Sequence, residues 1–173
     1  MKKITIYTLI LAVVALFGVS AYKEATKTGA KSKRLACHEK VTVFEKLHHP
    51  EALKGFKKEG ARISASVEVV PSVYRTSTLF AIVPQAEIEA MVEKHLRAKL
   101  GEQNLLHVAV TAVENDKGDP GKKNAEAKAF LGYVKASYYE NATLVYQIQV
   151  DFLEPSGIAG ALLCIDASVS SLP

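Results

Sequence analysis

The sequence predicts an α+β protein: an N-terminal hydrophobic leader, then one domain whose mainly antiparallel sheet packs on one long helix. Three observations carry this prediction. Residues 146–152 alternate strictly between apolar and polar side chains, which is typical of a strand with one buried face. Residues 85–100 carry apolar side chains at helical intervals, which indicates an amphipathic helix. Residues 4–22 hold no charged residue, which indicates a secretory or membrane segment.

The leader has the form of a bacterial secretory segment. A basic start at residues 1–3 precedes an apolar stretch, and Val19 and Ala21 fit the positions before a signal peptidase cut. However, residues 4–22 are also nearly long enough to span a bilayer, so an uncleaved inner-membrane anchor stays open. Either way we expect a periplasmic protein, released or anchored. Basic residues after the leader leave a third option, an inverted topology with a cytoplasmic domain.

Composition divides the chain into three parts and argues against nucleic acid as a partner. We expect a signal peptide or signal anchor at 1–21, a basic linker at 22–34 and a single extracytoplasmic domain at 35–173. The apolar fraction of 49% and the charged fraction of 23% are ordinary for globular proteins. The net charge of +4 is concentrated in the leader and linker, so the domain lacks the basic character of a nucleic-acid-binding protein.

The first half of the domain is expected to mix strands and helices. Residues 41–44 form a short apolar strand, and Pro50 begins a helix that continues to Lys58. Residues 63–69 alternate as a strand with one solvated face, and residues 78–83 form another apolar strand. Pro84 then precedes the long helix, which we expect to end at Gly101.

The second half is expected to be antiparallel sheet. Alternating apolar residues predict strands at 106–112, 130–138 and 146–152, and a continuous apolar run predicts a fourth at 161–169. The polar stretch 114–124 is expected to be a solvated loop, with partner binding as the alternative.

Two element orders fit these predictions. Residues 41–113 follow the strand-helix-strand-strand-helix-strand order of a ferredoxin-like unit. Alternatively, helix 85–100 crosses the four following strands, an order that resembles cystatin-like and cone-like folds over residues 85–170. The cystatin inhibitor motif Gln-x-Val-x-Gly is absent at residues 149–151, so the resemblance does not imply protease inhibition.

The two cysteines, Cys37 and Cys164, are expected to form a disulfide. Two thiols in an exported protein often pair, and the bridge would lie between the start of the domain and the last predicted strand. Two separate buried thiols are the alternative. Cys37 and His38 lack further ligands at a recognised spacing, so no metal site is predicted.

No catalytic or cofactor-binding residue can be assigned from the sequence. The five histidines stand in no recognised pattern, and neither a Gly-x-Ser-x-Gly nucleophile turn nor a glycine-rich phosphate loop occurs. The sequence therefore predicts no cofactor, and it favours a non-enzymatic protein without excluding an enzyme.

The alternation instead points to a possible partner-binding face. Because the apolar residues of 146–152 face the core, Gln147 and Gln149 face away, and Tyr133 and Tyr139 share their side of the sheet. Tyrosine and glutamine make an adaptable contact surface. An ordinary solvated face, or one covered by residues 41–83, is the alternative.

The expected function is therefore a non-enzymatic binding or assembly protein of the bacterial cell envelope. Its partner would be another envelope protein or a second copy, and inner-membrane attachment would use residues 4–22. The alternative is a periplasmic small-ligand-binding protein or enzyme that uses a pocket between sheet and helix.

Overall fold

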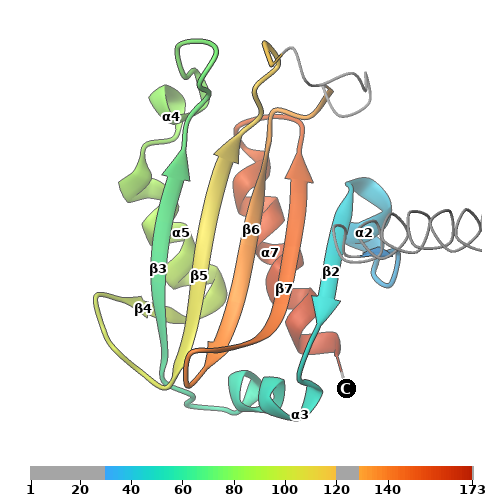
Figure 1. The fold of residues 1–173 in the computed structure, drawn as a ribbon, viewed down its shortest axis with the longest axis vertical. Helices are drawn as coiled ribbons and strands as arrows, with labels where there is room; N and C mark the ends of the chain where they lie inside the picture. Colours follow the sequence, from blue (N-terminus) through green and yellow to red (C-terminus); the bar gives the residue numbers. More distant parts are fainter. Residues whose placement is uncertain (1–29, 120–128, 173) are drawn as a thin grey trace, which may run out of the picture.

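The computed structural model describes residues 30–119 and 129–172, which form one mixed sheet with helices (Figure 1). The elements in chain order are β1 (Ala30–Lys31), α2 (Ala36–Lys40), β2 (Val43–Leu47), α3 (Pro50–Leu53), the 3-10 helix η1 (Lys54–Lys57), β3 (Ile63–Val70), α4 (Leu79–Ile82), α5 (Gln85–Leu96), β4 (Ala98–Leu100), β5 (Leu106–Glu114), β6 (Gly132–Glu140), β7 (Thr143–Phe152) and α7 (Gly157–Ser171). The strand order is β1-β2-β7-β6-β5-β3-β4. Strand β3 pairs in parallel with β4 and with β5, and the other neighbours are antiparallel.

The α+β class is confirmed, but the prediction of a sheet packed on one long helix is wrong. Two helices, α5 and α7, lie together behind the sheet in Figure 1. Ile88 and Val92 of α5 are fully buried, as are Ile158, Leu162 and Ile165 of α7. The core therefore lies between one sheet face and this helix pair.

The strand predicted at 161–169 is instead part of helix α7. Each buried residue of α7 lies three or four positions from another one: Ile158, Ala161, Leu162, Cys164, Ile165, Ser168 and Val169. This is the spacing of a helix face. A short apolar run does not distinguish a buried strand from a buried helix, and here tertiary packing selects the helix.

The strand predicted at 78–83 is the short helix α4. Its first amides are held from outside: Thr78 N and Leu79 N donate to Oε1 of Glu114, at 3.1 and 3.3 Å. A carboxylate from the end of β5 thus satisfies the free donors of this helix start. With 78–83 and 161–169 helical, neither the ferredoxin-like nor the cystatin-like order is realised.

The long predicted helix is shorter than expected. Helix α5 ends at Leu96, where Arg97 adopts a left-handed conformation with φ of 53°. The chain then forms β4, which pairs with the start of β3. The strands expected at 106–112, 130–138 and 146–152 are present as β5, β6 and β7, with bounds shifted by a few residues.

The predicted leader at 1–21 lies outside the described residues. Within residues 30–119 and 129–172, none of the helices has both the length and the apolar character needed to cross a bilayer. Residues 30–34, at the end of the predicted linker, take part in the fold. Ala30 and Lys31 pair with Glu45 and Phe44 of β2.

Candidate interaction face and disulfide cluster

One face of the sheet is not crossed by any helix of the described residues (Figure 1). Along β6 and β7, Val134, Ala136, Ile148 and Val150 are buried toward α5 and α7. The residues between them point to the other side and are half-buried: Tyr133, Lys135, Gln147 and Gln149. We call this second side the open face.

The open face is wide because the segment 41–83 does not cover it. Instead, β2 pairs with β7 and β3 pairs with β5, so both strands extend the sheet sideways. The alternative that this segment shields the face is therefore wrong. The open face spans β2, β7, β6, β5 and β3.

Hydrogen bonds hold the glutamines in place on the open face. Gln147 Nε2 donates to Ser137 Oγ across the strand pair at 3.1 Å, and Gln149 Nε2 donates to Asp151 Oδ1 at 2.9 Å. Both amides are thus oriented before any partner arrives, which lowers the entropy cost of binding.

Tyr139 lies further along the open face, where β6 and β7 shift register after Tyr138. Its ring centroid is 6.4 Å from that of His107. The two ring nitrogens of His107 lie within hydrogen-bonding distance of Ser64 Oγ and Ser66 Oγ, at 2.9 and 3.0 Å. The structure thus brings Tyr133, Tyr139, Gln147 and Gln149 onto one surface.

Two ionisable groups of the open face, Tyr133 and Asp151, have pKa values raised by burial. Burial raises the pKa of Asp151, against the hydrogen bond from Gln149 and the nearby charge of Lys31. Burial also raises the pKa of Tyr133, and the Asp151 carboxylate adds to that effect. This part of the face therefore offers a phenol and amides beside one acid, Asp151, and one base, Lys135.

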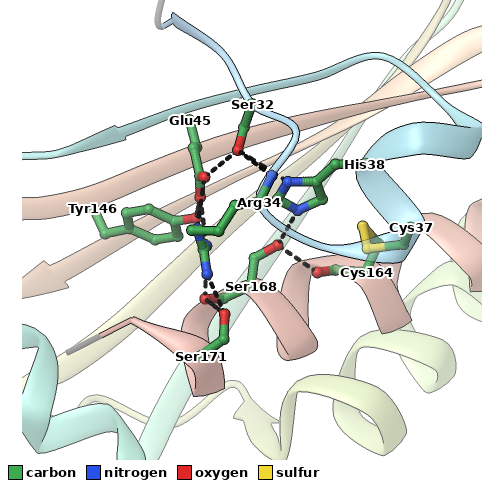
Figure 2. The surroundings of a disulfide bond; sticks show 9 residues. All are labelled: Ser32, Arg34, Cys37, His38, Glu45, Tyr146, Cys164, Ser168 and Ser171. Atoms are coloured by element: carbon green, nitrogen blue, oxygen red, sulfur yellow. Dashed lines mark hydrogen bonds and ion pairs between the residues drawn. A yellow bond between two sulfur atoms is a disulfide. The ribbon is translucent and has the colours of Figure 1, made fainter.

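The predicted disulfide is confirmed between Cys37 and Cys164 (Figure 2). Their Cα atoms are 5.9 Å apart, across 127 residues of sequence. The bridge joins α2 to helix α7, not to a final strand as the sequence predicted. Cys164 lies in a helix because residues 161–169 belong to α7 and do not form the predicted strand.

A polar cluster surrounds this disulfide, with Glu45 at its centre (Figure 2). Arg34 Nε and Nη2 donate to the two carboxylate oxygens at 3.0 and 2.8 Å. Ser32 Oγ and Tyr146 Oη each donate to Glu45 at 2.5 Å. Burial raises the pKa of Glu45, but these hydrogen bonds outweigh it and the pKa falls to about 2. Glu45 is therefore ionised at neutral pH.

His38 links this cluster to α7. Its Nδ1 lies 2.9 Å from Ser32 Oγ and its Nε2 lies 2.8 Å from Ser168 Oγ. Ser168 Oγ in turn donates to the carbonyl of Cys164 at 2.7 Å. Arg34 adds a bond to the Ser168 carbonyl at 3.1 Å and another to Ser171. The segment from Ser32 to His38 is thus fastened to the last helix.

The cluster contains a serine, a histidine and an acid, but its geometry does not suit nucleophilic catalysis. His38 bonds to Ser168 and to Ser32, and Ser32, not His38, contacts Glu45. Ser168 is fully buried and its hydroxyl donates to a main-chain carbonyl, so no substrate reaches it. Metal binding is also disfavoured in this state. Ligand atoms of Cys37, His38 and Cys164 lie within 4.8 Å of one another, but the two sulfur atoms are bonded together and are not thiolates.

Sequence reasoning missed this cluster. Glu45 looked like an isolated acid on a short strand, and Arg34 looked like part of a solvated linker. The available signal was Cys37: a bridge from it to Cys164 necessarily brings residues near 34 to residues near 168.

Comparisons with known proteins identify no family. No family model matches the chain, and no curated protein matches it. Among solved structures, the chain is similar to a PelC dodecamer from Paraburkholderia phytofirmans, a point variant of that protein, with 8% sequence identity and a TM-score of 0.40. That alignment covers 76% of this chain and 98% of the other. A TM-score this low supports no conclusion about fold or function.

Proposed function

We propose that this chain is a non-enzymatic binding or assembly protein of the bacterial cell envelope that contacts a protein partner through the open face. The observation that carries the proposal is the open face itself. The face spans five strands with no described helix across them, and its two middle strands β6 and β7 present half-buried tyrosine and glutamine side chains there. Such amphipathic side chains supply contact area at small entropy cost.

Two features support an envelope location. The sequence of residues 1–21 has the form of a secretory leader, and residues 4–22 would serve as an inner-membrane anchor if the leader is retained. The Cys37–Cys164 disulfide is of the kind that persists in an oxidising compartment such as the periplasm.

A second candidate function rests on a cavity. An apolar cavity of about 490 Å³ lies between α2, the end of β7 and α7, with Val150, Phe152 and Ala161 in its wall. Its volume falls within the usual range for small-molecule sites, which favours a periplasmic small-ligand-binding protein or enzyme as the alternative.

The test of the first proposal is a double variant, Tyr133→Asp with Gln147→Glu, compared with the wild type after native purification from membranes. Neither residue is in the core, so the melting temperature should change by no more than about 2–4 °C. Co-purification of another envelope protein should be lost.

The matched control is Ile82→Asp with Leu163→Glu, since both residues are exposed and lie on helices, α4 and α7, rather than on the open face. It should retain every partner that the open face holds. A folded Tyr133/Gln147 variant that keeps all its partners would remove the open face as the binding surface.

A further inference from the structure

The segment between β3 and α4 exposes an apolar tip. Val73 is 85% exposed and Tyr74 is 61% exposed, next to each other in the loop at the carboxyl end of β3 (Figure 1). We call these two residues the tip. Exposed apolar side chains are common singly, but two neighbours on a rigid loop need a reason.

Two carboxylates make this loop rigid. Asp116 Oδ2 accepts hydrogen bonds from the amides of Val73 and Tyr74, at 2.8 and 2.9 Å. Glu114, whose side chain is fully buried, forms an ion pair with Arg75 at 3.2 Å and caps the start of α4. Burial raises the pKa of Glu114, but hydrogen bonds from this loop lower it below its ordinary value.

Gly118 packs against Tyr74 of the tip. A Cβ atom at Gly118 would lie 3.3 Å from Cβ of Tyr74, so the two chain segments pack closely and leave little room for a side chain at Gly118. Since the amides of the tip are already bonded to Asp116, insertion into an apolar pocket would leave neither amide donor unpaired. The tip is therefore pre-organised for burial.

The same molecule carries a matching concave site. The cavity of about 490 Å³ described above is walled by the Cys37–Cys164 disulfide, Phe152 and Gly160 and is mainly apolar. A Cβ atom at Gly160 would meet nothing within 4 Å, so this glycine leaves the cavity open. Its volume exceeds that of one tyrosine side chain, which makes room for the tip.

We propose that the tip of one copy inserts into this cavity of a second copy. Strands β3 and β7 point to the same end of the sheet in Figure 1, so tip and cavity both lie there. Three strand spacings, about 14 Å, separate β3 from β7, so a chain cannot fill its own cavity. Exposed Lys117 lies beside the tip, and the cavity is lined by two acids, Asp151 and Glu154, against one base, Lys40, which leaves an acidic excess at its rim.

This contact rests on the assembly role proposed above but uses neither Tyr133 nor Gln147. Each copy carries one tip and one cavity, so two copies that meet at this end exchange tips. A self-complementary contact of this kind closes as a dimer.

The test is complementation between two variants of the full chain, purified in mild detergent. Tyr74→Asp places a charge on the apolar tip and leaves the cavity unchanged. Gly160→Leu fills the cavity with a side chain and leaves the tip unchanged. Each variant alone should sediment as a monomer at concentrations where the wild type is a dimer. A mixture of the two should form a heterodimer, at least tenfold more associated than either variant alone, because one intact tip then meets one intact cavity.

Charge reversal gives a second test that leaves the cavity unchanged. Lys117→Glu alone should weaken the dimer, and adding Glu154→Lys in the same chain should restore it. Leu105→Asp, at the opposite end of the sheet, should leave the dimer intact.

Three results would overturn the proposal. They are a monomeric wild type over the whole concentration range, a full-strength dimer of folded Tyr74→Asp, and folded variants that do not associate when mixed. The wild type could also prove monomeric and bind a small apolar probe that Gly160→Leu does not bind. That result would contradict the dimer and favour the ligand-binding function instead. The Tyr133/Gln147 variant should still dimerise, so failure of the open face is distinguished from failure of this contact.

Discussion

Glu45 is the residue on which the start of the described chain depends. Three side chains donate to its carboxylate: Arg34, Ser32 and Tyr146. Its own side chain is only 13% exposed, so removing one partner would leave a nearly buried charge without compensation. We therefore expect the stability of this region to depend on the ionised state of Glu45.

The first prediction is that Glu45→Gln removes an acid-dependent part of the stability. The pKa of Glu45 falls from 4.5 to about 2 on folding, so its contribution is present above pH 4.5 and is lost as the pH falls toward 2. The variant should lose roughly 2–3 kcal/mol of unfolding free energy at pH 7. Its stability should also vary less with pH between 4.5 and 2.

Urea unfolding at a series of pH values measures this effect. Glu39→Gln, at an exposed position on α2, is the control and should follow the wild type. If the unfolding free energy of Glu45→Gln depended on pH as that of the wild type does, the carboxylate of Glu45 would not stabilise the fold.

At the scale of elements, the local pattern predicted some structures and not others. Strand β7 was predictable because its alternation is strict, and helix α5 because its apolar stripe is long. Helix α4 was not, because its start is capped by Glu114, a residue 35 positions away from Leu79. The run 161–169 was ambiguous until its contacts with α5 and the sheet were known.

The candidate site shows the same division. The side of the sheet on which Gln147 and Gln149 lie follows from alternation alone. The contacts of His38 with Ser32 and Ser168 depend on tertiary structure, since Ser168 lies 130 residues away. Local sequence carries no information about such contacts.

The second prediction concerns the link between α2 and α7. Replacing both Cys37 and Cys164 by serine should lower the unfolding free energy by about 3–5 kcal/mol, because the closed loop is long. Denaturant titration measures the loss, and wild-type protein that has been reduced and alkylated should behave alike. Equal midpoints for the oxidised wild type and the double variant would mean that the bridge does not stabilise the domain.

At the scale of the whole molecule, the proposal needs the domain to lie outside the cytoplasm. The leader-like residues 1–21 and the disulfide support export. The open face and the tip then give the domain two separate surfaces for assembly in the envelope.

The third prediction is that a reporter enzyme active only after translocation works when it is fused behind Pro173. A reporter active only in the cytoplasm should be inactive at the same place. The reverse pattern would assign the domain to the cytoplasm and would remove the envelope from the proposed function. The mass of the purified protein would distinguish cleavage before Tyr22 from a retained membrane anchor.

The central claim is that the open face contacts a protein in the envelope, and site-specific photo-cross-linking in living cells tests it most directly. A photoreactive amino acid in place of Gln149 should yield one dominant cross-linked species that contains a protein. The same amino acid in place of Leu163, which is exposed on the outer side of α7, should yield none. Equal yields at both positions, or no product at 149 from folded, exported protein, would contradict the account.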